Sequence, residues 1–330
     1  MPEHRRGDLA EKKRDADWTW FAELFAAIQA NIERVVQGKT HEIRLALATL
    51  VAEGHLLIED VPGVGKTMLA KAMARSFDCA FRRIQFTPDL LPTDVMGVNV
   101  YNQERGDFEF KPGAVFANIV LGDEINRASP KTQSALLESM EEQQVTVDGV
   151  TYELGTPFMV IATQNPIEHE GTYPLPEAQL DRFMIRLSIG YPDPEAEAEI
   201  LATHGRHSTL EEIGPVTDAA GAARMIAIAR EVFVADALRR YIVDLVDSTR
   251  RHPDVYLGGS PRASLMLLRA TRALAASEGR DYAIPDDVKT LAIPVLAHRL
   301  IVSADAAMSG RDARAALTQS LDEVPVPVER

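Results

Sequence analysis

A phosphate-binding loop is the chemistry that this sequence displays most clearly. Residues 57–67 read Leu-Ile-Glu-Asp-Val-Pro-Gly-Val-Gly-Lys-Thr, between a short apolar run and an alanine-rich, helix-prone segment. In a strand–loop–helix context the loop amides cradle an anion, and Lys66 reaches the outer phosphates of a nucleotide. Thr67 offers a hydroxyl to Mg²⁺, and the positive end of the following helix faces the phosphates. The sequence therefore predicts a nucleotide site; the alternative is an ordinary strand–turn–helix corner that happens to carry Lys-Thr.

The loop departs from the usual pattern at one position. The pattern begins with glycine five residues before its last glycine, and Asp60 stands there in this chain. Only Gly63 and Gly65 remain to let the backbone approach a phosphate closely. We interpret Asp60 as a change of loop detail that leaves nucleotide binding intact.

Two adjacent carboxylates supply the second half of a hydrolytic site. Asp123 and Glu124 end a later apolar run. In enzymes with a phosphate loop, an acidic residue at such a strand end holds Mg²⁺, and a neighbouring carboxylate orients the attacking water or takes its proton. The pair could instead simply cap the next helix, but its combination with the upstream loop favours ATP hydrolysis.

A polar strand end follows the apolar run 158–162. Thr163-Gln164-Asn165-Pro166 comes directly after it, and a polar side chain there can hold the attacking water or the γ-phosphate. Asn165 is the first candidate and Thr163 the second. The alternative is a simple turn, since Asn-Pro initiates turns readily.

Two arginines could act on phosphate from further along the chain. Arg182 follows Asp181, and an arginine donated to a neighbouring subunit's γ-phosphate stabilises transition-state charge; from the sequence alone, an ion pair with Asp181 is the better interpretation. Arg262 follows Ser260-Pro261, an N-cap and a first-turn proline. It could reach a phosphate across an interdomain cleft. A solvated first-turn arginine is the alternative, but a positive charge is unfavourable near a helix N-terminus, which favours a functional role.

The elements that must position these residues alternate in type. Short apolar strands and helical segments predict a mostly parallel sheet with helices on both faces. Strands are expected near 56–58, 81–86, 118–121, 158–162 and 187–189, and hairpins at 98–110 and 145–152. Ser129-Pro130 predicts the start of a helix that continues to about residue 144. After Pro192-Asp193-Pro194 only helical periodicity is evident, near 195–204, 219–231, 235–251, 261–278 and 285–300.

These patterns divide the chain into four parts. We predict a mobile N-terminal tail at 1–16, an α/β domain at 17–191, a smaller all-α domain at 192–323 and a loose C-terminal tail at 324–330. Within the α/β domain, apolar residues recur every three or four positions between Phe21 and Val36, which predicts a helix with one buried face.

Composition sets limits on the class of protein. The chain has 330 residues, 35 Lys and Arg, and 49 Asp and Glu, which gives a formal net charge of −14. Such acidity argues against a surface that coats nucleic acid. One cysteine, Cys79, forms no intrachain disulfide and fits a reducing compartment. We expect no signal peptide, no membrane-spanning segment and a cytoplasmic location.

Long motifs in this sequence resemble those of the MoxR family of AAA+ ATPases. They are Gly-Lys-Thr at 65–67, Asp-Glu-Ile-Asn-Arg-Ala-Ser-Pro-Lys-Thr-Gln at 123–133, Leu-Leu-Glu-Ser-Met-Glu-Glu at 136–142, Ala-Thr-Gln-Asn-Pro-Ile-Glu-His-Glu-Gly-Thr-Tyr-Pro-Leu-Pro-Glu-Ala-Gln-Leu-Asp-Arg-Phe at 162–183 and Gly-Gly-Ser-Pro-Arg at 258–262. The resemblance covers about residues 20–305. It implies a P-loop NTPase fold of the AAA+ type, followed by a helical lid domain.

The resemblance also implies a role for each matching residue. Asp123 and Thr67 would bind Mg²⁺, Glu124 would act on water, and Asn165 would be the first sensor. Arg182 would be the arginine finger given in trans and Arg262 the second sensor. Val36-Gln37-Gly38 lies where the family contacts adenine. The other residues that would bind ATP belong to the phosphate loop and the start of its helix, and they are Pro62, Gly63, Val64, Gly65, Lys66, Thr67 and Met68. The two hairpins resemble inserts that face the central pore in related rings.

Members of this family are thought to be chaperone-like motors. The resemblance implies a homo-oligomer, typically a hexameric ring, that remodels client proteins during complex maturation or metal-cofactor insertion. Clients often carry von Willebrand factor A domains, and no nucleic-acid partner is expected. Two other functions share the same residues: a nucleic-acid motor such as a helicase subunit, and a nucleotide-gated binding module with little turnover.

Overall fold

The computed structural model describes residues 3–166, 172–192, 194–195, 197–198 and 209–327, with side chains from residue 16 onwards. The expected helix near 195–204 lies largely outside this described part, and residues 167–171 of the long motif lie wholly outside it. None of the helices within it combines the length and the hydropathy that a membrane-spanning helix requires.

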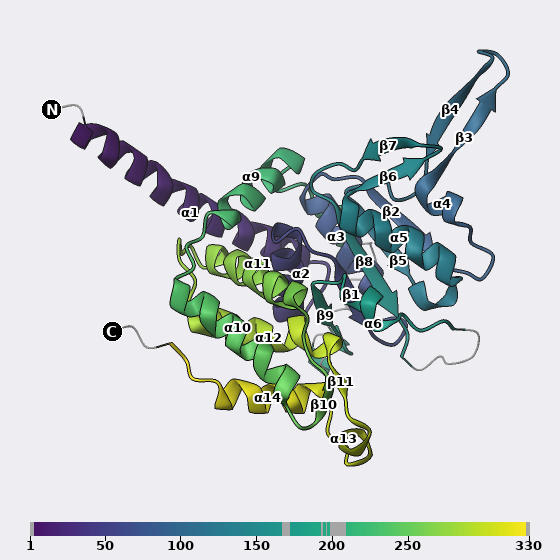
Figure 1. Cartoon of the computed structure of the whole chain (residues 1–330). Helices are drawn as coiled ribbons and strands as arrows, with labels where there is room; N and C mark the ends of the chain where they lie inside the picture. Colours follow the sequence, from purple (N-terminus) through teal and green to yellow (C-terminus); the bar gives the residue numbers. More distant parts are fainter. Residues whose placement is uncertain (1–2, 167–171, 193, 196, 199–208, 328–330) are drawn as a thin grey trace.

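A central parallel sheet organises the first part of the chain (Figure 1). Its strands are β1 (Leu56–Glu59), β2 (Phe81–Gln85), β5 (Ile119–Asp123), β8 (Met159–Gln164) and β9 (Ile185–Leu187). Their order is β2-β5-β8-β1-β9, and every pairing between neighbours is parallel. The predicted parallel sheet is thus confirmed, although β9 begins two residues before the expected strand. Because all five strands run the same way, their polar carboxyl ends meet at one edge.

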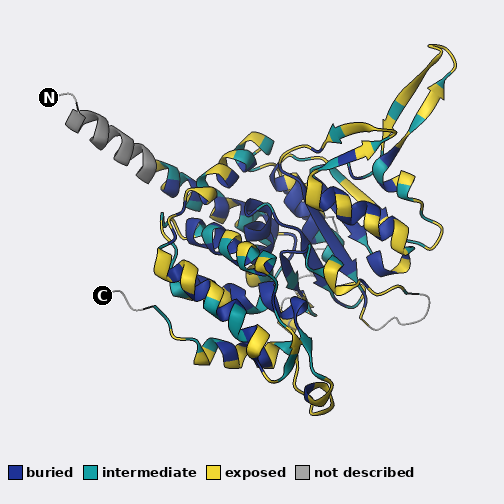
Figure 2. Ribbon diagram, in the orientation of Figure 1, coloured by how far each residue is buried: buried dark blue, intermediate teal, exposed yellow. Residues whose placement is uncertain are grey.

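Helices cover both faces of this sheet, as the alternation predicted. Successive residues of a strand point to opposite faces, so Leu56 and Ile58 pack against α1 (Glu3–Glu33), α2 (Thr40–Val51) and α3 (Lys66–Ser76). Leu57 faces the other side, where it shares a buried cluster with Leu136, Leu137 and Met140 of α5 (Pro130–Glu142). The inner strands β5, β8 and β1 are accordingly dark blue along most of their length in Figure 2, whereas β2 at the edge of the sheet is buried at Ile84 alone. The buried inner strands hold the residues at their ends in position.

The N-terminal helix is longer than the sequence pattern predicted. Its apolar face is buried as expected, with Phe21, Ile28 and Ile32 fully inaccessible. The helix begins at Glu3, within the segment for which we expected a mobile tail. Residues 3–16 are rich in Glu, Lys, Arg and Ala, which are strong helix formers, so the helix continues beyond its packed portion. Mobility of this segment stays a prediction.

Two β-hairpins project from the core domain, both where the turns predicted them. The first comprises β3 (Gly97–Asn102) and β4 (Asp107–Pro112), next to the short helix α4 (Pro92–Met96). The second comprises β6 (Gln144–Val147) and β7 (Val150–Glu153). Figure 1 shows them side by side at one end of the molecule, with the first hairpin extending further.

A helical lid follows the sheet. Its elements are α8 (Thr209–Glu212), α9 (Ala219–Arg230), α10 (Asp236–Arg251), α11 (Pro261–Ser277), α12 (Pro285–Leu296), η2 (Ala297–Arg299), α13 (Ala304–Met308) and α14 (Ala313–Glu323). The expectation of an all-α lid needs one correction, since β10 (Val255–Leu257) and β11 (Ile301–Val302) form a small antiparallel sheet. These strands have two and three residues, which is too short for a period-two pattern to show in the sequence. Residues 324–327 beyond α14 form no helix or strand.

Lid and core share one hydrophobic cluster. Side chains of α1 and α2 pack both against the sheet and against α9 and α11. The predicted division at residues 191 and 192 follows the last strand of the sheet, but the apolar interior continues across it. The lid is therefore held against the core by a substantial buried contact.

Candidate active site

The phosphate loop connects β1 to α3 and is shaped by two glycines. Gly63 and Gly65 have φ of 89° and 94°, a conformation that residues with a side chain rarely adopt. A Cβ placed on either glycine would meet nothing within 4 Å, so the loop encloses open space. A cavity of about 400 Å³ lies there, lined by Pro62, Gly63, Gly65, Lys66, Thr67 and Met68 and by five polar side chains from neighbouring strands. The loop therefore has the form of an anion cradle at a helix N-terminus.

Lys66 is oriented by the first residue of the loop. Its Nζ donates a hydrogen bond of 2.7 Å to the backbone oxygen of Asp60. Partial burial lowers the pKa of Lys66, and the carboxylates of Asp123, Asp60 and Glu124 act in the opposite direction. The ammonium group thus stands among acidic groups, where a triphosphate would also place negative charge.

The unusual Asp60 has a structural function. Its side chain is buried, and Oδ2 accepts hydrogen bonds from the Ser188 hydroxyl at 3.0 Å and the Gly190 amide at 2.6 Å. Oδ1 accepts from the amide of Val61 at 2.9 Å. The carboxylate joins the start of the phosphate loop to the segment that follows β9, and it does not line the cavity.

Asp123 ends β5 beside the loop, as the predicted magnesium ligand should. Its Oδ1 accepts a hydrogen bond of 2.6 Å from the Thr163 hydroxyl, and its Oδ2 accepts one of 2.6 Å from Nη2 of Arg83. Carboxylate and hydroxyl oxygens are suitable ligands for Mg²⁺. Asp123 and Thr67 line the same cavity, so the residues present fit this ion.

Glu124 has a strained backbone and a restrained side chain. Its φ of 56° is left-handed, which costs about 1–3 kcal/mol for a residue other than glycine and is typical of functional sites. Its Oε2 accepts hydrogen bonds from Gln85 at 2.8 Å and from Arg127 at 2.9 Å. Both partners must release or share this carboxylate before it can take a proton from water.

The structure separates the two candidates at the end of β8. Thr163 is fully buried and holds Asp123, while its oxygen also accepts from the Glu124 amide at 2.9 Å. Asn165 lies two residues further along and lines the cavity with Lys66. Asn165 is therefore placed to meet a phosphate, and Thr163 is placed to position the acidic pair.

Residues proposed to contact adenine surround a smaller hollow beside the loop. It has a volume of about 220 Å³, and its lining includes Gln37, Val64 and Met68, together with Val35 and Val36. Gly38 does not line it and borders a neighbouring surface hollow instead. An apolar hollow next to a phosphate cradle has the polarity that a nucleotide base requires.

Arg182 and Arg262 lie together, away from the phosphate cavity. Arg182 Nη2 is 3.2 Å from Oε2 of Glu141, and Arg262 Nη1 is 2.7 Å from Oε1 of the same residue. Asp181, the partner first expected for Arg182, instead binds Ser260 and Arg299 of the lid. Neither arginine lines the cavity at the loop, so Arg262 does not reach across the cleft of its own chain in this structure.

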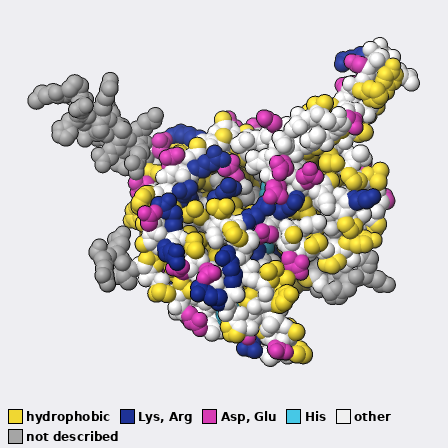
Figure 3. Space-filling model, viewed as in Figure 1, with side chains coloured by type: hydrophobic (Ala, Val, Ile, Leu, Met, Phe, Trp, Pro, Cys, Tyr) yellow, Lys and Arg dark blue, Asp and Glu magenta, His cyan; other side chains and the backbone are white. Residues whose placement is uncertain are grey.

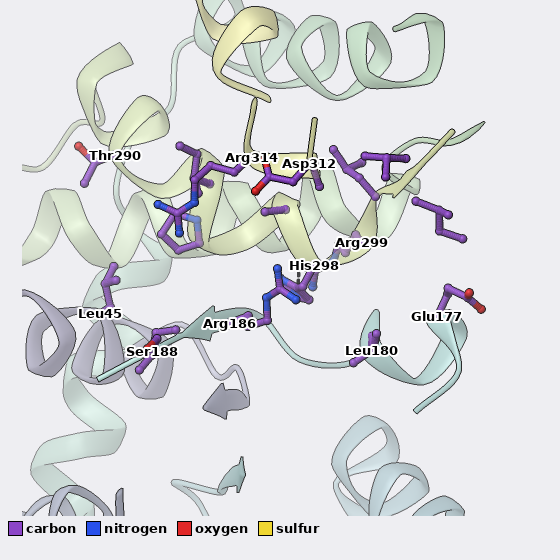
Figure 4. A pocket seen from close by; sticks show the side chains of 18 of the residues that line it. Leu45, Glu177, Leu180, Arg186, Ser188, Thr290, His298, Arg299, Asp312 and Arg314 are labelled. Carbon is purple, nitrogen blue, oxygen red and sulfur yellow. Dashed lines mark hydrogen bonds between the residues drawn. The ribbon is translucent and has the colours of Figure 1, made fainter. Parts of the chain in front are cut away.

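A hollow larger than the phosphate cavity lies elsewhere in the described part of the chain. It has a volume of about 970 Å³ and separates β9 and α6 (Glu177–Leu180) from α12, η2 and α14 (Figure 4). His298 and Arg299 on its wall are already engaged, the first with the Phe183 carbonyl and the second with Asp181. None of the residues predicted to act in the site lines it. We therefore assign the chemistry to the smaller cavity, where the loop and the acidic pair meet.

Two site residues escaped prediction. Arg83 and Gln85 of β2 line the cavity, and Arg83 also donates to Gln85 at 2.8 Å. Pairing with β5 sets Gln85 opposite Asp123. Polar residues at alternate positions near the carboxyl end of a strand were the available signal, because parallel strand ends share one edge of the sheet.

Comparison with known proteins identifies the chain. The family described as "ATPase family associated with various cellular activities (AAA)" matches residues 55–185, and an AAA lid domain matches residues 247–320. Chaperone MoxR1 of Mycobacterium tuberculosis is 43% identical over 90% of this chain and 80% of its own length. The uncharacterised protein YeaC of Bacillus subtilis is 50% identical over 91% of this chain and 94% of its own.

Solved structures agree with these sequence relatives. A crystal structure of a candidate ATPase from Cytophaga hutchinsonii is 37% identical, with a TM-score of 0.91, and covers 97% of this chain and 100% of its own. The MoxR protein of Paracoccus denitrificans is 33% identical over 86% of this chain and 90% of its own length. The chain accordingly contains the ATPase domain of an enzyme that hydrolyses ATP. The chain belongs to the MoxR family of AAA+ ATPases.

Proposed function

We propose that this ATPase is a ring-forming motor that remodels partner proteins and completes its active sites across subunit interfaces. One observation carries the proposal: Arg182 and Arg262 lie together at Glu141, apart from the cavity of their own phosphate loop. Arginines that lie outside the phosphate cavity of their own chain fit an arginine finger donated to a neighbouring copy. A contact between unlike surfaces, repeated by rotation, closes into a ring.

Within one site, the residues divide the work of hydrolysis. The loop amides and Lys66 hold the phosphates, and Thr67 and Asp123 would hold Mg²⁺, which neutralises charge on the β- and γ-phosphates when bound. Glu124, once released by Gln85 and Arg127, takes a proton from the attacking water. Asn165 orients this water or the γ-phosphate.

The hairpins are the proposed contact with client proteins. Tyr101 and Phe108 near the end of the first hairpin are 52% and 71% exposed, and their rings meet edge to face at 5.4 Å. Figure 3 shows hydrophobic side chains at this protruding end. Exposed aromatic pairs are typical of surfaces that bind other proteins. A relative named a chaperone supports a client of this kind.

The resemblance to the MoxR family also suggests the oligomeric state, the location and the clients of this protein. We expect a hexamer, a cytoplasmic location, and clients that carry von Willebrand factor A domains, acted on during complex maturation or metal-cofactor insertion. A nucleic-acid motor is the weaker candidate. Figure 3 shows Lys and Arg over the lid interspersed with Asp and Glu, and Arg239, Arg240 and Arg251 each pair with an aspartate on α10.

Subunit mixing tests the shared site. Lys66→Ala should not bind ATP, and Arg182→Ala should bind ATP but hydrolyse little of it when assembled. Mixing the two inactive variants should restore turnover, because about a quarter of randomly formed interfaces combine an intact loop with an intact finger. The measurement is the rate of phosphate release at protein concentrations above the one at which the subunits assemble.

A control mixture shows whether restored turnover depends on a site shared between subunits. A mixture of Lys66→Ala with Glu124→Gln should remain inactive, since both defects lie in the same half-site. If Lys66→Ala and Arg182→Ala stay inactive together although both assemble, the interface proposal is wrong. DNA- or RNA-stimulated turnover with steep salt dependence would instead favour the nucleic-acid motor.

A further inference from the structure

One carboxylate connects the two arginines that the proposed interface uses. Glu141 lies in the last turn of α5 and binds Arg182 through Oε2 at 3.2 Å and Arg262 through Oε1 at 2.7 Å. The first arginine belongs to the core and the second begins the lid helix α11. All three side chains are between 27% and 38% exposed, so the cluster is open to solvent and to a neighbour.

This cluster stands at the end of the sheet opposite to the phosphate loop. The carbonyl of Met140, next to Glu141, contacts Nε2 of His55 at 3.0 Å, and His55 directly precedes β1. The loop begins after the other end of β1, so the strand separates the two places by about 10 Å or more. The arginines are thus available to a phosphate that the same chain does not bind.

Charge explains why the carboxylate is needed. Two guanidinium groups repel each other, and a carboxylate between them makes their proximity favourable while leaving a net charge of about +1. Each guanidinium has five N–H donors, of which Glu141 takes one nitrogen of each. The remaining donors can bind phosphate oxygens. Exposed ion pairs stabilise folding by only about 0–1 kcal/mol, so fold stability alone does not account for the cluster.

The backbone around Arg182 is fixed to the same part of the lid. Asp181 accepts hydrogen bonds from the Ser260 hydroxyl at 3.0 Å and from Arg299 Nε at 2.8 Å. Ser260 caps the helix that Arg262 begins. Residues 181 and 182 and the start of α11 therefore form one connected unit.

We propose that Glu141 is a positioning residue that holds Arg182 and Arg262 as a paired receptor for the triphosphate bound by a second copy of this chain. The inference rests on the interface site proposed above and adds a residue that lies within a quoted motif, at 136–142, but to which the resemblance assigned no role. Glu141 does not touch the nucleotide. It sets the separation and direction of the two groups that do.

Kinetics of Glu141→Gln test this role. The variant should assemble and bind ATP normally, yet its turnover per assembled subunit should fall about tenfold, a part of the 10³–10⁵ that a trans arginine supplies. KM should change little, because the loop that binds ATP belongs to the other copy. Glu142→Gln is the matched control, since it removes the same charge from the exposed neighbouring position and should keep normal turnover.

A double variant separates positioning from a general structural effect. Because Glu141 acts partly through Arg262, the loss of activation free energy in the double variant Glu141→Gln/Arg262→Ala should be smaller than the sum of the two single losses. Glu141→Asp, which is too short to hold both partners, should give an intermediate rate. Normal turnover in Glu141→Gln, with Arg182→Ala impaired, overturns the role of Glu141 alone; normal turnover in assembled Arg182→Ala overturns the interface and the role together.

Discussion

At the scale of single residues, we expect Asp60 to stabilise the fold without contributing to ATP binding. Its buried carboxylate accepts three hydrogen bonds, from Val61, Ser188 and Gly190, and lines no part of the cavity. Replacing it with glycine would restore the usual loop pattern and remove these bonds. We expect Asp60→Gly to keep ATP binding in calorimetry and to lower the free energy of unfolding by about 2–3 kcal/mol, since bonds to charged groups are worth more than neutral ones.

Asp60→Asn is the graded control for this prediction. Its amide oxygen can accept from one or two of the donors, but its NH₂ group faces a donor, so an intermediate stability is expected. Urea unfolding of the three proteins measures the series. Equal stability of Asp60→Gly and the unchanged chain would contradict the structural role.

Some site residues could be predicted from the sequence and others could not. Lys66, Asp123 and Glu124 could be predicted because their motifs depend on neighbours along the chain. The choice between Thr163 and Asn165 stayed open until the structure showed that Thr163 binds Asp123. The contacts of Arg182 and Arg262 with Glu141 join residues distant in the sequence, and no local pattern encodes such a meeting.

At the scale of elements, the first hairpin offers a test of client binding. Tyr101 and Phe108 are exposed and contact mainly each other, so substituting both should cost little stability. Glu124→Gln should hold ATP and accumulate clients. Adding Tyr101→Ser and Phe108→Ser to it should leave ATP binding intact and reduce client recovery by affinity capture and mass spectrometry.

A matched control comes from the lid. Tyr256 on β10 is 81% exposed and lies far along the chain from the hairpins, so Tyr256→Ser in the same Glu124→Gln background should retain the clients. Equal recovery with and without the hairpin aromatics would exclude this hairpin as the client contact.

Elements with strong local signals were predictable, and their mutual packing was not. Asp148 and Gly149 both have positive φ, as the turn type of a two-residue hairpin requires. The second hairpin could therefore be predicted from this dipeptide. Phe110 stacks on Tyr152, with ring centroids 4.0 Å apart, and joins the two hairpins. No sequence pattern predicted this contact, because the two residues belong to different hairpins. Strands β10 and β11 were missed, since such short elements carry too little periodicity. Helix α14, with 11 residues, was not among the predicted helices either.

At the scale of the whole molecule, the domain order could be predicted, but the junction between lid and core could not. Two buried histidines bear on the stability of the molecule, one inside the core and one between the lid and the core. His55 contacts the Met140 carbonyl and accepts from the Val160 amide, both at 3.0 Å, and His298 of the lid contacts the Phe183 carbonyl at 3.0 Å. Burial lowers the pKa of His55 to about 4, and burial and the adjacent Arg299 lower the pKa of His298 well below its usual value.

These pKa values predict that acid weakens the whole structure. Between pH 6.5 and pH 4 the unfolded chain binds a proton at His55 that the folded chain does not, so the free energy of unfolding falls as pH falls through this range. At pH 5 the loss from His55 is about 2 kcal/mol, since one pKa unit corresponds to about 1.4 kcal/mol. His298 shifts stability in the same direction.

Urea midpoints at pH 7 and pH 5 should therefore differ less for His55→Gln than for the unchanged chain, even though the variant begins less stable. His41→Gln, at an exposed histidine of α2, should keep the full difference. An unchanged difference in His55→Gln would show that the stability of the fold does not depend on a neutral imidazole at this position.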